Sequence, residues 1–140
     1  WRADKASKLV YAMALDEGDP AKEVQYRDEV FELEAPFNGD GKSILKTINR
    51  FRYITWGTDN LAIGYDYWWN TRNTKTYQFD PSNNKIDPVV LHDRNYQDQY
   101  ADPGSFETKL NEFANYVLAV NDNKGYMIGD GYTAEGQFPF

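Results

Sequence analysis

The stretch between residues 65 and 72 carries the densest group of side chains that could bind a ligand, Tyr-Asp-Tyr-Trp-Trp-Asn-Thr-Arg. Successive side chains of a strand point to opposite faces, so Trp68 and Trp69 cannot both pack into one apolar layer. We expect one tryptophan in the core and the other on a surface or in a cavity. There, Arg72 could bind a carboxylate through two parallel hydrogen bonds. The alternative is aromatic packing, with Arg72 in an ion pair between neighbouring sheets.

The groups needed for catalysis are largely missing from the sequence. The single histidine, His92, is predicted at the end of an edge strand, and no Gly-x-Ser-x-Gly elbow supplies the nucleophile of a Ser-His-Asp triad. One histidine without any cysteine does not make the usual metal site. We therefore predict no catalytic residue, no metal and no cofactor in this chain.

Short motifs that imitate ligand-binding loops fail on their spacing. Residues 41–43, Gly-Lys-Ser, resemble the end of a phosphate loop, but Pro36 stands where the first glycine is required. Residues 121–123, Asn-Asp-Asn, resemble half a calcium loop. Both motifs are predicted to be turns. Paired carboxylates could flank a glycosidic bond, but Glu32 and Glu34 are predicted to face solvent, which makes a glycosidase the weaker interpretation.

The composition indicates an ordered, strand-rich protein. Hydrophobic residues make up 41% and aromatic residues 16% of the 140 residues, which favours strands and excludes intrinsic disorder. The net charge of −7 argues against nucleic acid, and no apolar run is long enough to suggest a membrane span. Because the chain starts at Trp1 and stops on apolar residues, we expect it to be cut from a longer one. The basic residues are scattered except for one cluster, which is predicted to lie at solvated strand ends. It consists of Lys42, Lys46, Arg50 and Arg52.

Two parts of the sequence resemble each other at an offset of 46 residues. The shift places residues 30–35 on residues 76–81, and it also places residues 44–45 on residues 90–91. One offset therefore aligns two separate predicted strands. A period of about 40–50 residues with four strands is typical of a β-propeller blade.

Tight turns and one insertion mark the boundaries of the repeat. Residues 54–63 and residues 117–128 both read as strand, polar turn and strand, and residues 1–11 are predicted to be a third copy. The connection from 93 to 115 interrupts the period. Within it, Ser105 could cap a short helix that carries Phe106, Leu110 and Phe113 on one face. We expect this connection to be a packed interblade loop, with a binding loop as the alternative.

The predicted fold is all-β, a partial β-propeller of antiparallel, four-stranded blades. It divides into an incomplete blade at 1–50 with its last three strands, a complete blade at 51–94, an insertion loop at 95–115 and the opening hairpin of the next blade at 116–140. Strands with two apolar faces, such as Leu9–Leu15, belong between neighbouring sheets. With such faces uncovered, we expect the chain to self-associate.

Four segments, taken in order, carry a resemblance to a known family. They are Trp56-Gly57-x-Asp59-x-Leu61-Ala62, Trp68-Trp69-Asn70-Thr71-Arg72-x-Thr74-x-Thr76, Asp93-Arg94-x-Tyr96-x-Asp98-x-Tyr100-x-Asp102-Pro103-Gly104 and Gly129-Asp130-Gly131-x-x-x-Glu135-Gly136-x-x-Pro139-Phe140. In this order they resemble the N-terminal propeller of prolyl oligopeptidase-family serine peptidases. The branch looks like the glutamyl endopeptidase-like enzymes of chloroplasts and bacteria, of the exported Bacteroides type.

The resemblance implies that this chain is not itself an enzyme. In the family, the catalytic residues lie in a C-terminal α/β-hydrolase domain, which is the implied partner, and the propeller covers the active site and admits only peptides. The resemblance further implies a periplasmic or secreted bacterial protein. Substrate contacts are hypothesised for Trp68, Trp69, Arg72 and Arg94, with the arginines facing an acidic side chain. The alternative function is a stand-alone module that binds sugar or peptide through exposed aromatic residues.

Overall fold

The computed structural model describes residues 1–140, and every regular element in it is a β-strand. No helix is present, so none is long and apolar enough to cross a membrane. All strand pairs are antiparallel, which confirms the predicted all-β fold class. The strands are β1 (Lys8–Ala14), β2 (Asp28–Glu34), β3 (Lys42–Thr47), β4 (Arg50–Thr58), β5 (Leu61–Tyr67), β6 (Asn73–Phe79), β7 (Val89–Asn95), β8 (Ser105–Phe106), β9 (Thr108–Leu110), β10 (Tyr116–Leu118), β11 (Val120–Asn121), β12 (Lys124–Gly125), β13 (Met127–Ile128), β14 (Tyr132–Thr133) and β15 (Gly136–Gln137).

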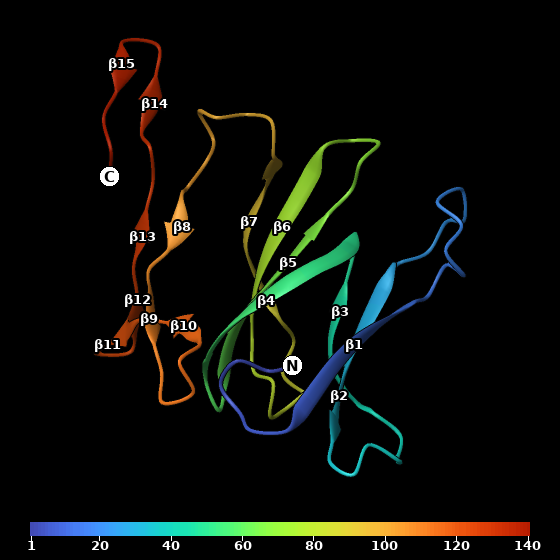
Figure 1. Cartoon of the computed structure of the whole chain (residues 1–140). Coiled ribbons are helices and arrows are strands. Elements are labelled where there is room, and N and C mark those ends of the chain that lie inside the picture. The colour runs from blue at the N-terminus through green and yellow to red at the C-terminus, as the bar shows by residue number, and fades with distance from the viewer.

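Strands β4 to β7 form a four-stranded sheet in which each strand pairs with the next one in the sequence (Figure 1). The Asp59-Asn60 turn joins β4 to β5, because Thr58 pairs directly with Leu61. Asp and Asn favour such tight turns because they tolerate left-handed backbone conformations. A four-stranded antiparallel sheet in chain order is the form of a propeller blade.

Strands β1, β2 and β3 form a three-stranded sheet that repeats the arrangement of β5, β6 and β7. In chain order it is the first sheet, and the sheet of β4 to β7 is the second. Each sheet carries a β-bulge at the corresponding place, between Val30 and Phe31 in one sheet and between Thr76 and Tyr77 in the other. These two bulges lie 46 residues apart, which is the offset seen in the sequence. The structural repeat therefore extends to an irregularity that no hydrophobic pattern specifies.

The hydrophobic core lies mainly where the two sheets pack against each other. Gly64 on β5 allows a close approach of the two sheets, because a Cβ atom added there would lie 2.6 Å from Cδ2 of Leu45 on β3. Only 22 of the 140 residues are buried, so this interface supplies most of the apolar packing. The clustered side chains are Val30, Ile44, Leu45, Trp56, Ala62, Tyr77, Phe79 and Val117.

The prediction of a short helix between Ser105 and Phe113 is wrong. Residues 105–110 are extended, with Phe106 of β8 paired to Met127 of β13, and Leu110 of β9 paired to Tyr116 of β10. Backbone pairing with the later strands satisfies the N–H and C=O groups of this segment, and this long-range pairing overrides the local helical pattern. The segment predicted as an insertion loop thus supplies strands that pair with the following part of the chain.

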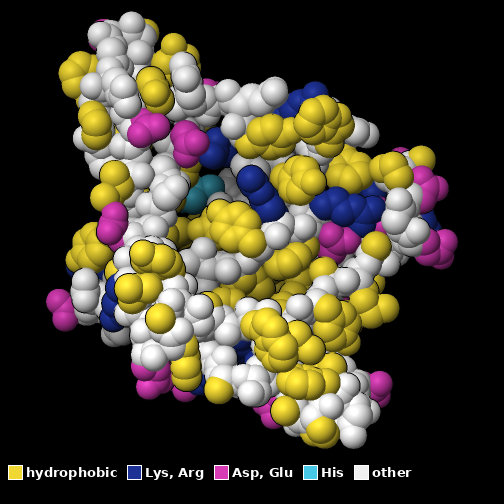
Figure 2. All heavy atoms as spheres, viewed as in Figure 1, with side chains coloured by type: hydrophobic (Ala, Val, Ile, Leu, Met, Phe, Trp, Pro, Cys, Tyr) yellow, Lys and Arg dark blue, Asp and Glu magenta, His cyan; other side chains and the backbone are white.

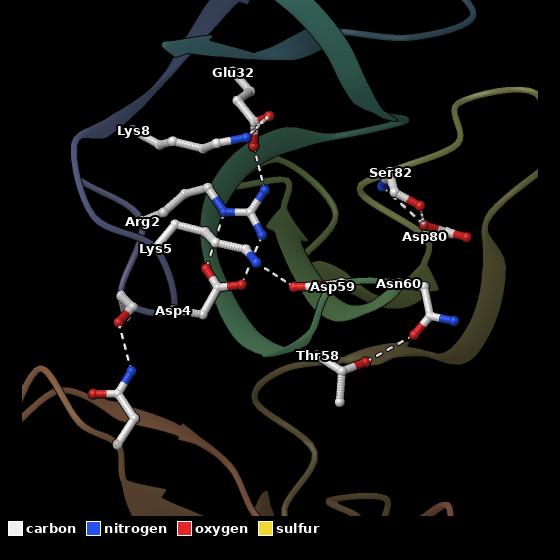
Figure 3. Close-up of polar contacts among 12 residues, drawn as sticks. Arg2, Asp4, Lys5, Lys8, Glu32, Thr58, Asp59, Asn60, Asp80 and Ser82 are labelled. Carbon is white, nitrogen blue, oxygen red and sulfur yellow. Dashed lines mark hydrogen bonds and ion pairs between the residues drawn. The ribbon is translucent and has the colours of Figure 1, made fainter. Parts of the chain in front are cut away.

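The expectation that Glu32 faces solvent is also wrong. Its side chain is buried and is held by the Arg2 guanidinium and by Lys8 Nζ, the latter at 3.0 Å (Figure 3). Arg2 itself is buried, with its guanidinium 4.0 Å from the centroid of the Trp56 ring. Burial opposes the charge on Glu32, but hydrogen bonds from Arg2 and Lys8 outweigh it and lower the pKa of the carboxyl group. A buried guanidinium requires a counter-charge, and Glu32 provides it.

Candidate functional site

The two tryptophans that follow β5 lie in different surroundings. Trp68 is half-buried beneath the Arg27 guanidinium, which lies 3.7 Å from the ring centroid. Its backbone N–H donates to the Asn73 carbonyl at 2.7 Å, which closes the connection between β5 and β6. Trp69, in contrast, is 64% exposed. Of this pair, Trp69 is the side chain that is more accessible to a ligand.

Arg72 lies against Trp69 instead of against a carboxylate. The guanidinium carbon is 3.8 Å from the Trp69 ring centroid, and the guanidinium also donates to the Trp69 carbonyl oxygen. No acidic side chain contacts Arg72, so the ion pair considered as its structural role is not formed. A stacked guanidinium keeps N–H donors in its plane, where they can meet a carboxylate.

Arg94 projects from β7, opposite Thr74 of β6, and already holds a carboxylate. Its Nη2 lies 2.9 Å from Oδ2 of Asp102, in the connection that follows β7, and its Nη1 donates to the Asn95 carbonyl. Only 19% of the Arg94 side chain is exposed. Part of the hydrogen-bonding capacity of Arg94 is therefore used within the chain.

An open hollow brings two of the four predicted residues, Trp69 and Arg94, together. Neither Arg72 nor Trp68 lines it, although Arg72 contacts the Trp69 ring. Figure 2 shows Lys and Arg side chains set among hydrophobic ones over the sheet of β4 to β7. The hollow is lined by Phe51, Arg52, Tyr67, Trp69, Arg94, Tyr96 and Asp102.

A second hollow adjoins the first and shares Arg52, Arg94, Tyr96 and Asp102 with it. Hydroxyl groups line much of the remainder. Tyr65 stacks on Tyr53 with ring centroids 4.3 Å apart, and burial raises the pKa of its phenol to about 12. The other hydroxyl-bearing residues outside the shared part are Thr55, Thr74, Thr76 and Ser105.

Arg52 is the residue of these hollows that sequence reasoning misses. Arg52 is exposed near the start of β4, as predicted for a solvated strand end, but it also lines both hollows, at a β-bulge of β4. Phe51 pairs with Asp66 and Tyr53 pairs with Tyr65, so Arg52 has no partner across the strand pair. No sequence signal marks this bulge, because Arg52 lies in an otherwise regular strand pattern.

Arg50, predicted to be a solvated strand end, is instead part of a buried ion-pair cluster between the sheets. Its Nη2 lies 2.7 Å from both carboxylate oxygens of Asp16, and its Nη1 lies 2.7 Å from Asp28. Asp16 is fully buried and also accepts a 2.7 Å hydrogen bond from Arg27. Burial disfavours its charge, but hydrogen bonds from Arg50, Arg27 and the Gly18 N–H lower the pKa of Asp16. This cluster fixes β4, and with it Arg52, relative to the first sheet.

The groups that line the two hollows are suited to binding a charged ligand. His92 lies on β7 opposite Thr76. No serine of the hollows sits beside a general base, which nucleophilic catalysis requires. Guanidinium groups with aromatic walls can hold a negatively charged group that carries an apolar stem.

Comparison with known proteins relates the chain to one kind of protein. No family model matches it, and no solved structure matches it. It aligns over its full length with two curated proteins named "Probable glutamyl endopeptidase, chloroplastic". The one from Arabidopsis thaliana is 38% identical over 148 residues, and the one from Oryza sativa subsp. japonica is 35% identical over 147 residues. The chain spans 15% and 16% of their lengths, so it is similar throughout to one segment of these plant proteins.

Proposed function

We propose that this chain is part of the propeller domain of a serine peptidase of the prolyl oligopeptidase family, in the glutamyl endopeptidase-like branch. In the intact enzyme, the propeller would cover the active site and restrict entry to peptides. The observation that carries the proposal is the similarity of the whole chain to one segment of two probable glutamyl endopeptidases. The catalytic residues would belong to an α/β-hydrolase domain elsewhere in the longer protein.

The architecture supports this role. Two equivalent antiparallel sheets pack face to face and share an offset of 46 residues, as successive blades of a propeller do. Sheets packed in this way can be repeated around a central channel, and such a channel admits an extended peptide more readily than a folded protein. The ion pairs between Arg50, Asp16 and Asp28 would hold two blades together at the rim.

The substrate contacts belong to the same proposal. Trp69, Arg72 and Arg94 would meet the acidic side chain of a peptide, because Trp69 and Arg94 line one hollow and the Arg72 guanidinium stacks on Trp69. The name of the two relatives refers to glutamyl peptides, and guanidinium is the side-chain group that binds a carboxylate bidentately. Trp68 would act in packing, beneath Arg27.

The test uses the intact gene product and this chain side by side. The intact protein should cleave a short glutamate-containing peptide and should leave uncut a folded protein that carries the same sequence in a loop. The 140-residue chain alone should cleave neither. Equal cleavage of the folded protein would contradict the gating role, and an intact protein without peptidase activity would overturn the proposal.

A stand-alone binding module is the second candidate, favoured by aromatic rings that are more than half exposed, including Trp69 and Tyr100. Saturable binding of a glycan by the chain itself, lost in Trp69→Ala, would support that role.

Export of the protein to the periplasm or the medium is part of the main proposal. Fractionation of cells that produce the intact protein tests it, and retention in the cytoplasm would contradict it.

A further inference from the structure

The bulge in β4 gives Arg52 a position that a regular strand would not. Two pairs flank it, Phe51 with Asp66 and Tyr53 with Tyr65, and Arg52 is the extra residue between them. Such bulges re-aim a side chain and occur often beside functional sites. Here the residue at the bulge is Arg52, whose charged side chain lines both hollows.

The guanidinium of Arg52 has no counter-charge in the chain. Its side chain is exposed and enters no ion pair, and its guanidinium carbon lies 5.8 Å from the ring centroid of Tyr53 and 6.0 Å from that of Tyr67. The chain has 22 acidic residues and a net charge of −7, yet Arg52, like Arg72, pairs with none of them. The four arginines that do pair with carboxylates are Arg2, Arg27, Arg50 and Arg94.

The walls around Arg52 define the ligand further. Arg94 lies in the same hollow, so a negative charge placed there would face two guanidinium groups against one carboxylate, that of Asp102. Phe51, Tyr67, Trp69 and Tyr96 supply apolar and aromatic surface. An acidic side chain with an aliphatic stem matches both features, whereas inorganic phosphate has no part that could use the aromatic walls.

We propose that Arg52 is the primary carboxylate-binding residue of this hollow and that its ligand is a glutamate side chain of a peptide. Asp102 is then an internal carboxylate that occupies Arg94 and competes with the ligand for it. The assignment deepens the proposed function and rests on it for its biological role, but binding is a property that the chain can show alone.

The experiment titrates the chain with a blocked tripeptide, acetyl-Ala-Glu-Ala-amide, at protein concentrations where light scattering reports a monomer. Tryptophan fluorescence gives the readout, because Trp69 lines the hollow. We expect saturable binding, with the matching glutamine peptide bound about tenfold more weakly, since a charge-assisted hydrogen bond is lost. Inorganic phosphate at equal concentration should compete poorly.

Three variants separate the roles of the residues. Arg52→Gln should weaken glutamate-peptide binding about tenfold, and Asp102→Asn should strengthen it by freeing Arg94. Lys109→Gln, at an exposed position on β9, is the matched control for the loss of one positive charge and should change little. Circular dichroism should show an unchanged fold in all three.

Several outcomes would overturn the inference. They are equal affinity for the glutamate and glutamine peptides, phosphate binding as tight as that of the glutamate peptide, an Arg52→Gln variant that binds like the wild type, or an equal loss in Lys109→Gln. The proposed function can fail separately. An intact protein without peptidase activity would remove that function, while glutamate-peptide binding through Arg52 would still stand.

Discussion

Asp66 shows how a single buried carboxylate can organise a sheet interface without a cation. Its side chain is fully buried on β5 and accepts four hydrogen bonds. Oδ1 accepts from Asn49 Nδ2 at 3.0 Å and from the Lys75 N–H at 2.9 Å. Oδ2 accepts from the Asn49 N–H at 3.0 Å and from the Tyr77 hydroxyl at 2.6 Å. The carboxylate thereby ties the link between β3 and β4 to the second sheet.

Replacing this carboxylate tests its role at the residue scale. In Asp66→Asn, an NH2 group would face two donors, so we expect the free energy of unfolding to fall by about 3 kcal/mol. Tyr77→Phe removes only one of the four donors and should cost about 1 kcal/mol. Urea denaturation measures both. A loss in Asp66→Asn no larger than that in Tyr77→Phe would contradict the account.

At the scale of elements, Asp16, in the connection after β1, links the two sheets and makes the link acid-sensitive. Its pKa is below the ordinary value of 3.8 because Arg50, Arg27 and the Gly18 N–H hold the carboxylate, although burial acts in the opposite direction. A carboxyl group with a depressed folded-state pKa stabilises the fold fully above its unfolded pKa. That stability is lost as the pH falls through the lower, folded-state pKa.

The Asp16→Asn variant isolates this contribution. At about pH 7 we expect it to unfold with about 3 kcal/mol less free energy than the wild type, since Arg50 and Arg27 lose their buried partner. At pH values below the folded-state pKa, the gap between wild type and variant should shrink, because Asp16 is then protonated in both states of the wild type. Urea denaturation across an acid pH series measures the gap. A gap that stays constant with pH would refute the linkage.

The elements differ in how far their sequences reveal them. The Asp59-Asn60 turn and the alternation in β6 are local signals, and the all-β class is confirmed by the structure. The segment from Ser105 to Phe113 misleads because its helical spacing is local while its strand partners, β10 and β13, lie later in the chain.

The candidate site is foreseen only in part for similar reasons. Adjacent side chains diverge on a strand, and this places Trp68 and Trp69 in different surroundings, as the sequence leads one to expect. The position of Arg52 depends on a bulge, and the burial of Glu32 depends on Arg2, thirty residues away. No local sequence pattern predicts either the bulge at Arg52 or the contact between Arg2 and Glu32.

At the scale of the whole molecule, the chain exposes more surface than a compact protein of its size. Its accessible surface is 8882 Å², whereas a folded monomer of 16.2 kDa is expected to expose about 7,500 Å². Part of the excess lies on the outer face of β1. Tyr11 and Met13 are 39% and 54% exposed there. In the repeat, β1 corresponds to β5, and the residues of β5 at the same two positions, Gly64 and Asp66, are buried against the first sheet.

This uncovered face should drive self-association, because it is chemically a sheet interface without its partner. Light scattering should report masses above 16.2 kDa that rise with concentration. Met13→Lys places a charge on the face and should shift the chain toward the monomer. Ile86→Lys, at a site 56% exposed in the connection between β6 and β7, is the matched control and should leave association unchanged. A monomer at high concentration would contradict the prediction, and an equal effect of both variants would show that charge, not this face, controls association.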